Sequence, residues 1–194
     1  MTTQLQIFLS TKTMSFMNLE KATAKYETEP MVGNISRLVD FDIYHCLLAG
    51  SLSTSIKIQE KYPNLPVEYL DWIKVCDGGL LFDTVMLSTK GHDDKLDLDF
   101  DTFDDMNSDE AKADFDLPDG YVVFAMRSYG DPICFNCNEK DGKVYLWDVE
   151  NKEFSDIWDS FADWITEEID DAVQLIAEDA LEPLNIKLGG DDDE

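Results

Sequence analysis

The chain has 194 residues, of which 44% are hydrophobic and 11% aromatic, so it can bury a substantial core and is not a disordered chain. Its 42 acidic residues against 15 Lys and Arg give a formal net charge of −27. This charge disfavours direct binding to nucleic acid or to an anionic membrane. It favours a basic protein as partner, although a high net charge also serves solubility alone.

The sequence predicts a soluble, cytoplasmic protein. No stretch reaches the roughly 18 apolar residues that a membrane helix needs, and the first residues lack a basic start followed by an apolar core. The four cysteines, Cys46, Cys76, Cys134 and Cys137, are too few for a disulfide framework in a chain of this size. We therefore expect reduced thiols.

The N-terminal third shows the weakest pattern. Residues 1–34 have no sustained period and are interpreted as an N-terminal extension. Apolar residues between Leu38 and Leu48 suggest a first helix. Gly50–Ser51 and the serines and threonine of residues 53–55 are expected to break that helix into two pieces.

Residues 62–81, YPNLPVEYLDWIKVCDGGLL, predict a short helix. Pro66 suits a first turn, because its ring presets φ and its missing N–H has no intrahelical partner there. Four residues then share one face: Tyr69, Leu70, Ile73 and Cys76. Leu65 is expected to be buried with the first three. The pair Gly78–Gly79 is expected to end the helix, with positive φ at one or both glycines.

Strands are expected after the glycine pair. Residues 80–88, 121–128, 132–138 and 143–149 are rich in Val, Ile, Tyr and Phe, with an interruption of the first near Asp83. Turn signals at residues 130–132 and 141–142 separate the last three strands. Such short connections require an antiparallel meander.

An acidic segment covers about residues 92–117. In residues 96–101 the apolar side chains alternate with Asp97, Asp99 and Asp101, which predicts a strand with one acidic face. The Asp spacing does not predict an EF-hand, because Thr102 and Ser108 stand where Gly and Glu are needed. The acidic face is either a solvated surface or a docking surface for a cationic partner.

The docking interpretation names seven candidate partner-binding residues. Asp104 and Asp105 continue the acidic run, and the aromatic residues Phe103 and Tyr129 are expected in loops, where one of them could project as an anchor. The full set is Asp97, Asp99, Asp101, Asp104, Asp105, Phe103 and Tyr129.

The C-terminal part predicts a long helix from about Ser160 to residue 182. Its apolar residues keep a 3.6-residue period, and Ser160 with Asp163 resembles a capping box. We expect this helix to lie across the sheet. Pro183 ends it, and residues 183–194 form an acidic tail.

No residue pattern predicts catalysis, a metal site or a cofactor. His45 and His92 have no recognisable nucleophile nearby in the sequence. Cys134 and Cys137 form a C-x-x-C, but no second ligand pair follows, and a predicted strand is the wrong context for a redox motif. We interpret these cysteines as buried structural thiols.

Several segments together resemble the SUKH superfamily, which includes the fungal cell-wall-synthesis regulator and bacterial immunity proteins of toxin systems. The segments are LPVEYLDWIKVCDGG, then LPDGYVVFAMRSYGDPICFN, then GKVYLWDVENKEF and IWDSFADWI, and they span roughly residues 35–170. The resemblance implies an α+β domain at residues 35–182, with helices packed on a curved antiparallel sheet.

The resemblance also implies a module that has no catalytic activity and binds another protein. With the net charge, it favours an immunity protein that binds and neutralises a toxin, in particular a basic nuclease. The alternative is an acidic mimic of DNA that blocks a nucleic-acid-binding factor. An immunity protein needs one patch with apolar anchors, whereas a mimic needs regularly spaced carboxylates over much of its surface.

Overall fold

The computed structural model describes residues 45–89 and 102–181. In this part of the chain, one antiparallel sheet of seven strands is ordered as the strands follow in sequence. The strands are β1 (His45–Ala49), β2 (Cys76–Leu81), β3 (Thr84–Met86), β4 (Tyr121–Arg127), β5 (Pro132–Asn136), β6 (Val144–Asp148) and β7 (Glu153–Trp158). The predicted extension at residues 1–34, the acidic strand at residues 96–101 and the tail at residues 183–194 lie outside the described residues.

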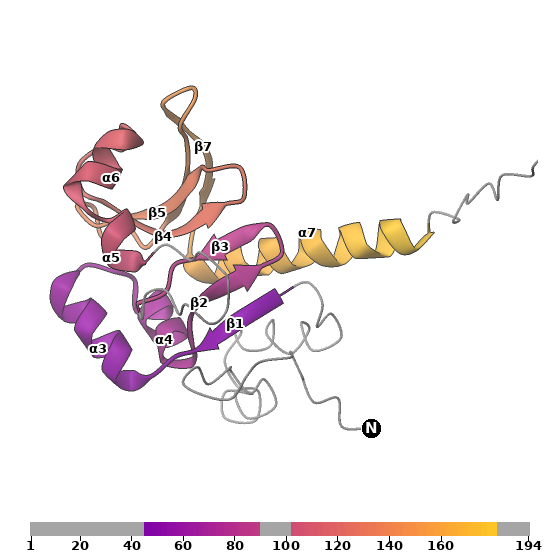
Figure 1. Ribbon diagram of the computed structural model, residues 1–194, viewed down its shortest axis with the longest axis horizontal. Coiled ribbons are helices and arrows are strands. Elements are labelled where there is room, and N and C mark those ends of the chain that lie inside the picture. The colour runs from indigo at the N-terminus through magenta and orange to yellow at the C-terminus, as the bar shows by residue number, and fades with distance from the viewer. Residues whose placement is uncertain (1–44, 90–101, 182–194) are drawn as a thin grey trace, which may run out of the picture.

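Five helices flank this sheet in the described residues (Figure 1). They are α3 (Leu52–Lys61), α4 (Val67–Val75), α5 (Phe103–Met106), α6 (Asp109–Asp114) and α7 (Phe161–Leu181). The prediction of an α+β fold with an antiparallel sheet, flanking helices and a long C-terminal helix is confirmed.

The prediction of a helix before Gly50 is wrong for the residues that the structure describes. Residues 45–49 form strand β1, which pairs with β2. Ser51 does not break a helix but begins one, because its Oγ accepts a hydrogen bond from the N–H of Thr54 at 3.1 Å. The serines and threonine after Gly50 therefore mark a helix start, and α3 runs on to Lys61.

The helix predicted at Pro66 is present as α4, and Leu65, Tyr69, Leu70 and Ile73 are buried as predicted. Its end was predicted wrongly. The helix stops at Val75, and Cys76 and the glycine pair belong to β2. Both glycines have positive φ, 85° at Gly78 and 125° at Gly79, but they lie within strand β2 and do not end the helix. A Cβ on Gly78 would lie 2.7 Å from Ser88 Cα, so glycine lets the backbone after β3 approach closely.

We expect Gly78→Ala to lower the free energy of unfolding by about 2 kcal/mol, because alanine meets both the positive φ and the close backbone of Ser88. Urea unfolding measures the loss. Gly142→Ala is the control, since Gly142 also has a positive φ, 75°, but a Cβ there meets no atom within 4 Å. Equal losses in the two variants would contradict the packing part of this account.

The strand predictions are confirmed for the β4–β5–β6 meander and incomplete elsewhere. Residues 80–88 fold back on themselves as the β2–β3 hairpin, with Phe82 at φ 55° in the turn. Strand β7 was missed because four of its six side chains are exposed, so the sequence has no apolar alternation there. The sheet therefore has more strands than its apolar pattern shows.

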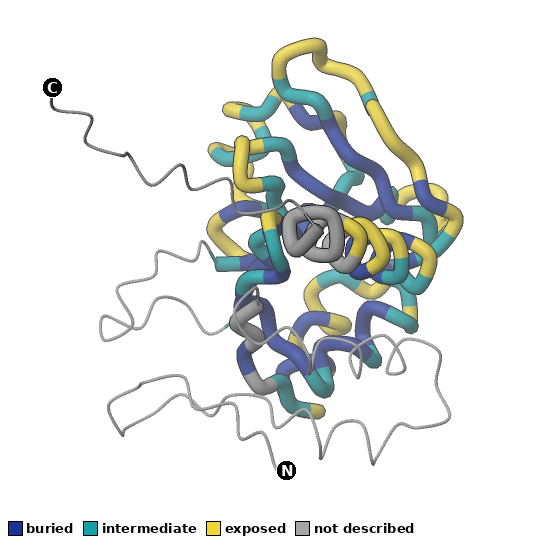
Figure 2. The backbone as a smooth tube through the Cα atoms, turned by 90° about the vertical axis from the view of Figure 1, so that its right-hand side faces the viewer, coloured by how far each residue is buried: buried dark blue, intermediate teal, exposed yellow. Residues whose placement is uncertain are grey.

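The main core lies between one face of the sheet and helices α4 and α7, which contact each other. Aromatic rings fill it: Phe124 lies 4.3 Å from Phe135, 5.2 Å from Tyr69 and 5.0 Å from Trp164 between ring centroids. Buried backbone accordingly runs through the centre of the sheet, while the β6–β7 turn and most of β7 are exposed (Figure 2).

The capping box predicted for the C-terminal helix is present. The N–H of Asp163 donates to Ser160 Oγ at 3.0 Å, and the Ser160 hydroxyl donates to Asp163 Oδ2 at 2.7 Å. Helix α7 packs its first turns on the sheet, and its C-terminal end projects beyond the sheet (Figure 1).

Candidate functional site

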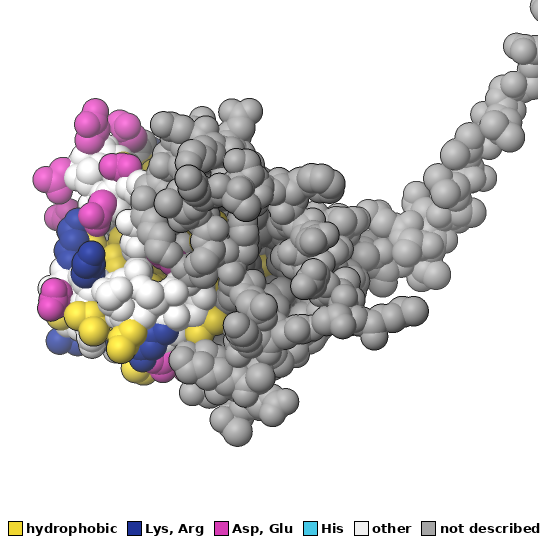
Figure 3. Space-filling model, turned by 60° about the horizontal axis from the view of Figure 1, so that its bottom comes forward, with side chains coloured by type: hydrophobic (Ala, Val, Ile, Leu, Met, Phe, Trp, Pro, Cys, Tyr) yellow, Lys and Arg dark blue, Asp and Glu magenta, His cyan; other side chains and the backbone are white. Residues whose placement is uncertain are grey.

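An acidic surface lies over α5, α6 and the loop that follows. Seven carboxylates share it, and all seven residues are exposed. They are Asp104, Asp105, Asp109, Glu110, Asp114, Asp116 and Asp119. In Figure 3, acidic side chains gather at the upper left of the face shown, and cationic and apolar side chains lie beside them.

Local capping explains why this acidic stretch is helical. Thr102 caps α5, accepting from the N–H of Asp105 at 3.0 Å, and Ser108 caps α6, accepting from the N–H of Ala111 at 3.2 Å. Acids in the first turn of each helix favour the positive end of the helix dipole. Five of the seven charges thus lie in two short helices, and Asp116 and Asp119 lie in the loop after α6.

The buried side chain of Phe103 and the half-buried side chain of Asn107 fix the acidic surface to the domain. Phe103 is 0% exposed, and its ring lies 5.3 Å from Tyr62 and 6.4 Å from Tyr69. Asn107 binds the backbone of β4 on both sides: its Nδ2 donates to Val123 O at 2.7 Å, and its Oδ1 accepts from Val123 N at 2.8 Å. The side chain thereby takes the place of a neighbouring strand where β3 is too short to reach.

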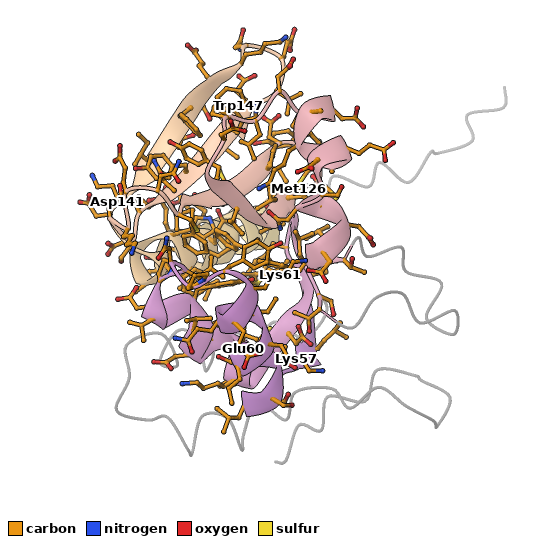
Figure 4. The ribbon with its side chains drawn as sticks, turned by 90° about the vertical axis from the view of Figure 1, so that its left-hand side faces the viewer. Lys57, Glu60, Lys61, Met126, Asp141 and Trp147 are labelled. Atoms are coloured by element: carbon orange, nitrogen blue, oxygen red, sulfur yellow. The ribbon has the colours of Figure 1, made fainter. Side chains whose placement is uncertain are left out.

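Contacts at the two ends of the acidic surface connect it to α3 and to the β6–β7 hairpin. Lys61 Nζ lies 2.6 Å from Asp104, and Lys152 Nζ lies 2.5 Å from Asp116. Trp147 Nε1 donates to the carbonyl of Phe115 at 2.9 Å. The exposed ion pairs contribute little stability. In Figure 4, Lys57, Glu60 and Lys61 lie together on α3, and Trp147 lies at the opposite end of the sheet.

The structure brings together only part of the predicted partner-binding set. Asp104 and Asp105 lie next to each other on the exposed side of α5. Asp97, Asp99 and Asp101 lie outside the described residues. The two aspartates belong to helix α5, where Asp104 pairs with Lys61 and Asp105 accepts from Thr102 Oγ1.

The expectation that Phe103 projects from a loop is wrong. Phe103 is the first residue of α5 and is buried with Met106, one turn later. Its acidic neighbours hid this, because they make the segment look like a solvated loop. The Thr102–Asp105 cap and the spacing of the two apolar residues are the signals that could have predicted a short packed helix.

Tyr129 lies in the turn between β4 and β5, as predicted, and is 66% exposed. The turn lies at the C-terminal end of β4, away from Val123 and α5. It meets the β2–β3 turn, where Ser128 N donates to Asp83 O at 2.8 Å. Tyr129 and the acidic surface are therefore separate features of the molecule.

Sequence reasoning missed a polar cluster beneath this turn. Arg127 binds Glu168 through both guanidinium nitrogens at 2.6 Å, and its Nη1 donates to Thr84 Oγ1 at 2.9 Å. Burial raises the pKa of Glu168, and the guanidinium opposes that shift only in part. The cluster joins α7 to β3 and β4. No local pattern could predict it, because its members lie 41 to 84 residues apart along the chain.

The cysteines of the C-x-x-C are free thiols inside the fold. Cys134 is buried on β5, and Cys137 is half-buried just after that strand. Burial raises the pKa of the Cys134 thiol well above its ordinary value and that of Cys137 to about 11. In the described ranges, no group of three or more His, Cys, Asp or Glu side chains is placed to hold a metal ion.

We expect Cys137 to react with iodoacetamide at pH 8 about 100-fold more slowly in the folded protein than after unfolding. The reason is that a pKa of about 11, against an ordinary 9.0, lowers the thiolate fraction by about that factor. Mass spectrometry of timed alkylation, site by site, measures both rates. Equal rates in the folded and unfolded protein would show that the thiol is accessible and its pKa unshifted.

The described residues combine an antiparallel sheet, helices packed on it and an exposed acidic surface. Comparison with protein families identifies the family. The model of the SMI1 / KNR4 family (SUKH-1) matches residues 56–167, more than half of the chain, and the chain belongs to this family. The resemblance inferred from the sequence is thereby confirmed.

Membership of this family supports a protein-binding or immunity-type module, and its members are generally non-catalytic. Comparison with curated proteins and with solved structures found no match. Within residues 45–89 and 102–181, no helix is long and apolar enough to cross a membrane.

Proposed function

We propose that this protein is an immunity protein that binds and neutralises a basic protein toxin, and that the acidic surface over α5 and α6 docks the toxin. The observation that carries the proposal is the set of seven exposed carboxylates within residues 104–119, where Lys112 is the sole cation. A surface of one sign of charge attracts an oppositely charged protein over several ångströms and raises its association rate.

The way in which the acidic surface is held also supports the proposal. Buried Phe103 and the paired hydrogen bonds of Asn107 fix α5 to the core, so the carboxylates are ordered before the partner arrives. A preordered surface loses less conformational entropy on binding. Such a surface suits an inhibitor, which must hold its target tightly.

A nuclease is the class of toxin that fits this charge best. Nucleases that grip a phosphate backbone carry Lys and Arg where the nucleic acid binds, and an inhibitor with a net charge of −27 is complementary to that site. A mimic of DNA would instead spread carboxylates regularly over the molecule. Here Lys61 and Lys152 flank the acidic surface, and apolar Leu52 and Val67 are exposed on the α3–α4 side.

The first partner to test is the protein encoded by the gene next to this one. We expect the purified protein to form a one-to-one complex with a toxin domain encoded there and to abolish its activity. The control is the same assay with a basic nuclease from an unrelated organism, which should bind weakly and only at low salt. Equal binding to both nucleases would contradict a cognate immunity role and favour an unspecific acidic decoy.

A further inference from the structure

Strand β7 is the outer strand of the sheet at the C-terminal end of the meander. Among the described residues it pairs with β6 only, so its second row of backbone N–H and C=O groups has no strand partner there. Unpaired edges of this kind are templates for an added strand. Strand β7 has six residues, long enough to pair with a peptide.

The side chains of β7 are divided by chemistry between the two faces of the sheet. Phe154 pairs with Trp147 and Ile157 with Tyr145, so both apolar residues lie on the same face. Phe154 lies 4.9 Å from Trp147 and 5.3 Å from Tyr145 between ring centroids, in an aromatic cluster. Ile157 continues this cluster toward the free edge and is 55% exposed.

The opposite face of the same strand carries two exposed acids beside the buried Trp158. Glu153 pairs with Asp148, and Asp156 pairs with Leu146. Exposed Asp159 follows directly after the strand. The register shift that places Ser155 between two paired positions puts Glu153, Asp156 and Trp158 on one face and Phe154 and Ile157 on the other.

A second copy of this chain does not suit this edge. Two copies, each with a net charge of −27, repel each other at long range. The exposed isoleucine also distinguishes β7 from an edge protected by charge alone, where every outward side chain is polar.

We infer that the free edge of β7 binds an extended segment of a partner protein in which cationic and apolar residues alternate. The cations of this segment lie beside Glu153 and Asp156, and its apolar side chains lie beside Phe154 and Ile157. The added strand satisfies the outer backbone groups of β7. This site is distinct from the acidic surface over α5 and α6 and does not depend on the partner being a toxin.

The test uses a seven-residue peptide of alternating Lys and Val, blocked at both ends, with the full chain. Its control is a Lys–Pro peptide of the same length and charge, which cannot donate the hydrogen bonds of a strand. We expect the Lys–Val peptide to bind at least about tenfold more tightly and to slow hydrogen exchange in residues 153–158.

Two protein variants locate the site. Ile157→Lys places a cation at the proposed anchor and is expected to weaken Lys–Val binding at least about tenfold. Ile56→Lys makes the same chemical change on α3, where Ile56 is 46% exposed, and is expected to change binding less than about twofold. Equal binding of the two peptides, equal effects of the two variants, or unchanged hydrogen exchange in β7 would overturn the inference.

Discussion

Glu168→Ala is expected to lower the free energy of unfolding by about 4 kcal/mol, the largest loss among the substitutions considered. Glu168 is 7% exposed, and the Arg127 side chain beside it is 15% exposed. Removing the carboxylate leaves a mostly buried guanidinium whose one remaining partner of opposite charge among the described residues is Asp83, at 3.4 Å. Urea unfolding of both proteins measures the loss.

Two further variants separate the buried ion pair from ordinary packing. Replacing both partners together, Arg127→Met with Glu168→Leu, should restore stability to within about 1 kcal/mol of the wild type, because no buried charge is left alone. Asp104→Ala breaks the exposed pair with Lys61 and should cost less than about 1 kcal/mol. A double variant as unstable as Glu168→Ala would show that the cluster contributes something other than charge pairing.

Asn107→Ala is expected to lower the free energy of unfolding by about 3 kcal/mol, the second largest loss. The substitution removes both hydrogen bonds to Val123, and Val123 is 0% exposed, so its N–H and C=O groups lose their partners at a buried position. Thermal unfolding followed by circular dichroism measures the change. The same variant should also loosen α5, which is seen as faster hydrogen exchange in residues 103–114.

Asn151→Ala is the matched control for this effect. The Asn151 side chain donates one hydrogen bond, from Nδ2 to Asp148 Oδ2 at 2.7 Å, and it lies exposed in the β6–β7 turn. Water can solvate the groups that it leaves, so its loss should stay below about 1 kcal/mol. Similar losses for Asn107→Ala and Asn151→Ala would show that Asn107 does not act by satisfying buried backbone groups.

Much of the fold could be predicted from local patterns in the sequence. The period of α7, the proline at the start of α4 and the turn signals of the β4–β6 meander each depend on neighbouring residues, and each prediction was confirmed. The errors also have local causes. Ser51 was interpreted as a helix breaker, although serine is a good N-cap. Gly78 was interpreted as a helix stop, although its lack of a side chain lets the backbone of Ser88 approach closely.

The candidate site could be predicted only in part, because its organisation depends on contacts between distant segments. Charge density pointed to Asp104 and Asp105, but the burial of Phe103 depends on Tyr62 and Tyr69 of other elements. In the sequence nothing distinguishes Asn107 from other polar residues. Its role follows from the folded structure, in which β3 ends before it reaches Val123. Strand β7 carries no apolar alternation, so its place at the sheet edge follows from the folded structure.

The central claim is that the acidic surface over α5 and α6 docks a basic partner, and association kinetics test it directly. The test variant removes three charges from that surface. It carries Asp104→Asn, Asp105→Asn and Glu110→Gln. A matched control removes three exposed charges of the same kinds from α7. It carries Asp170→Asn, Asp171→Asn and Glu167→Gln.

The measurement is the association rate constant with the cognate toxin domain at several salt concentrations, for the wild type and both variants. We predict that the α5–α6 variant associates about tenfold more slowly at low salt and depends less steeply on salt, whereas its dissociation rate changes little. The α7 control should stay close to the wild type in both respects. Equal rates and equal salt slopes for all three proteins would contradict the proposed docking surface and place the toxin on another face of the molecule.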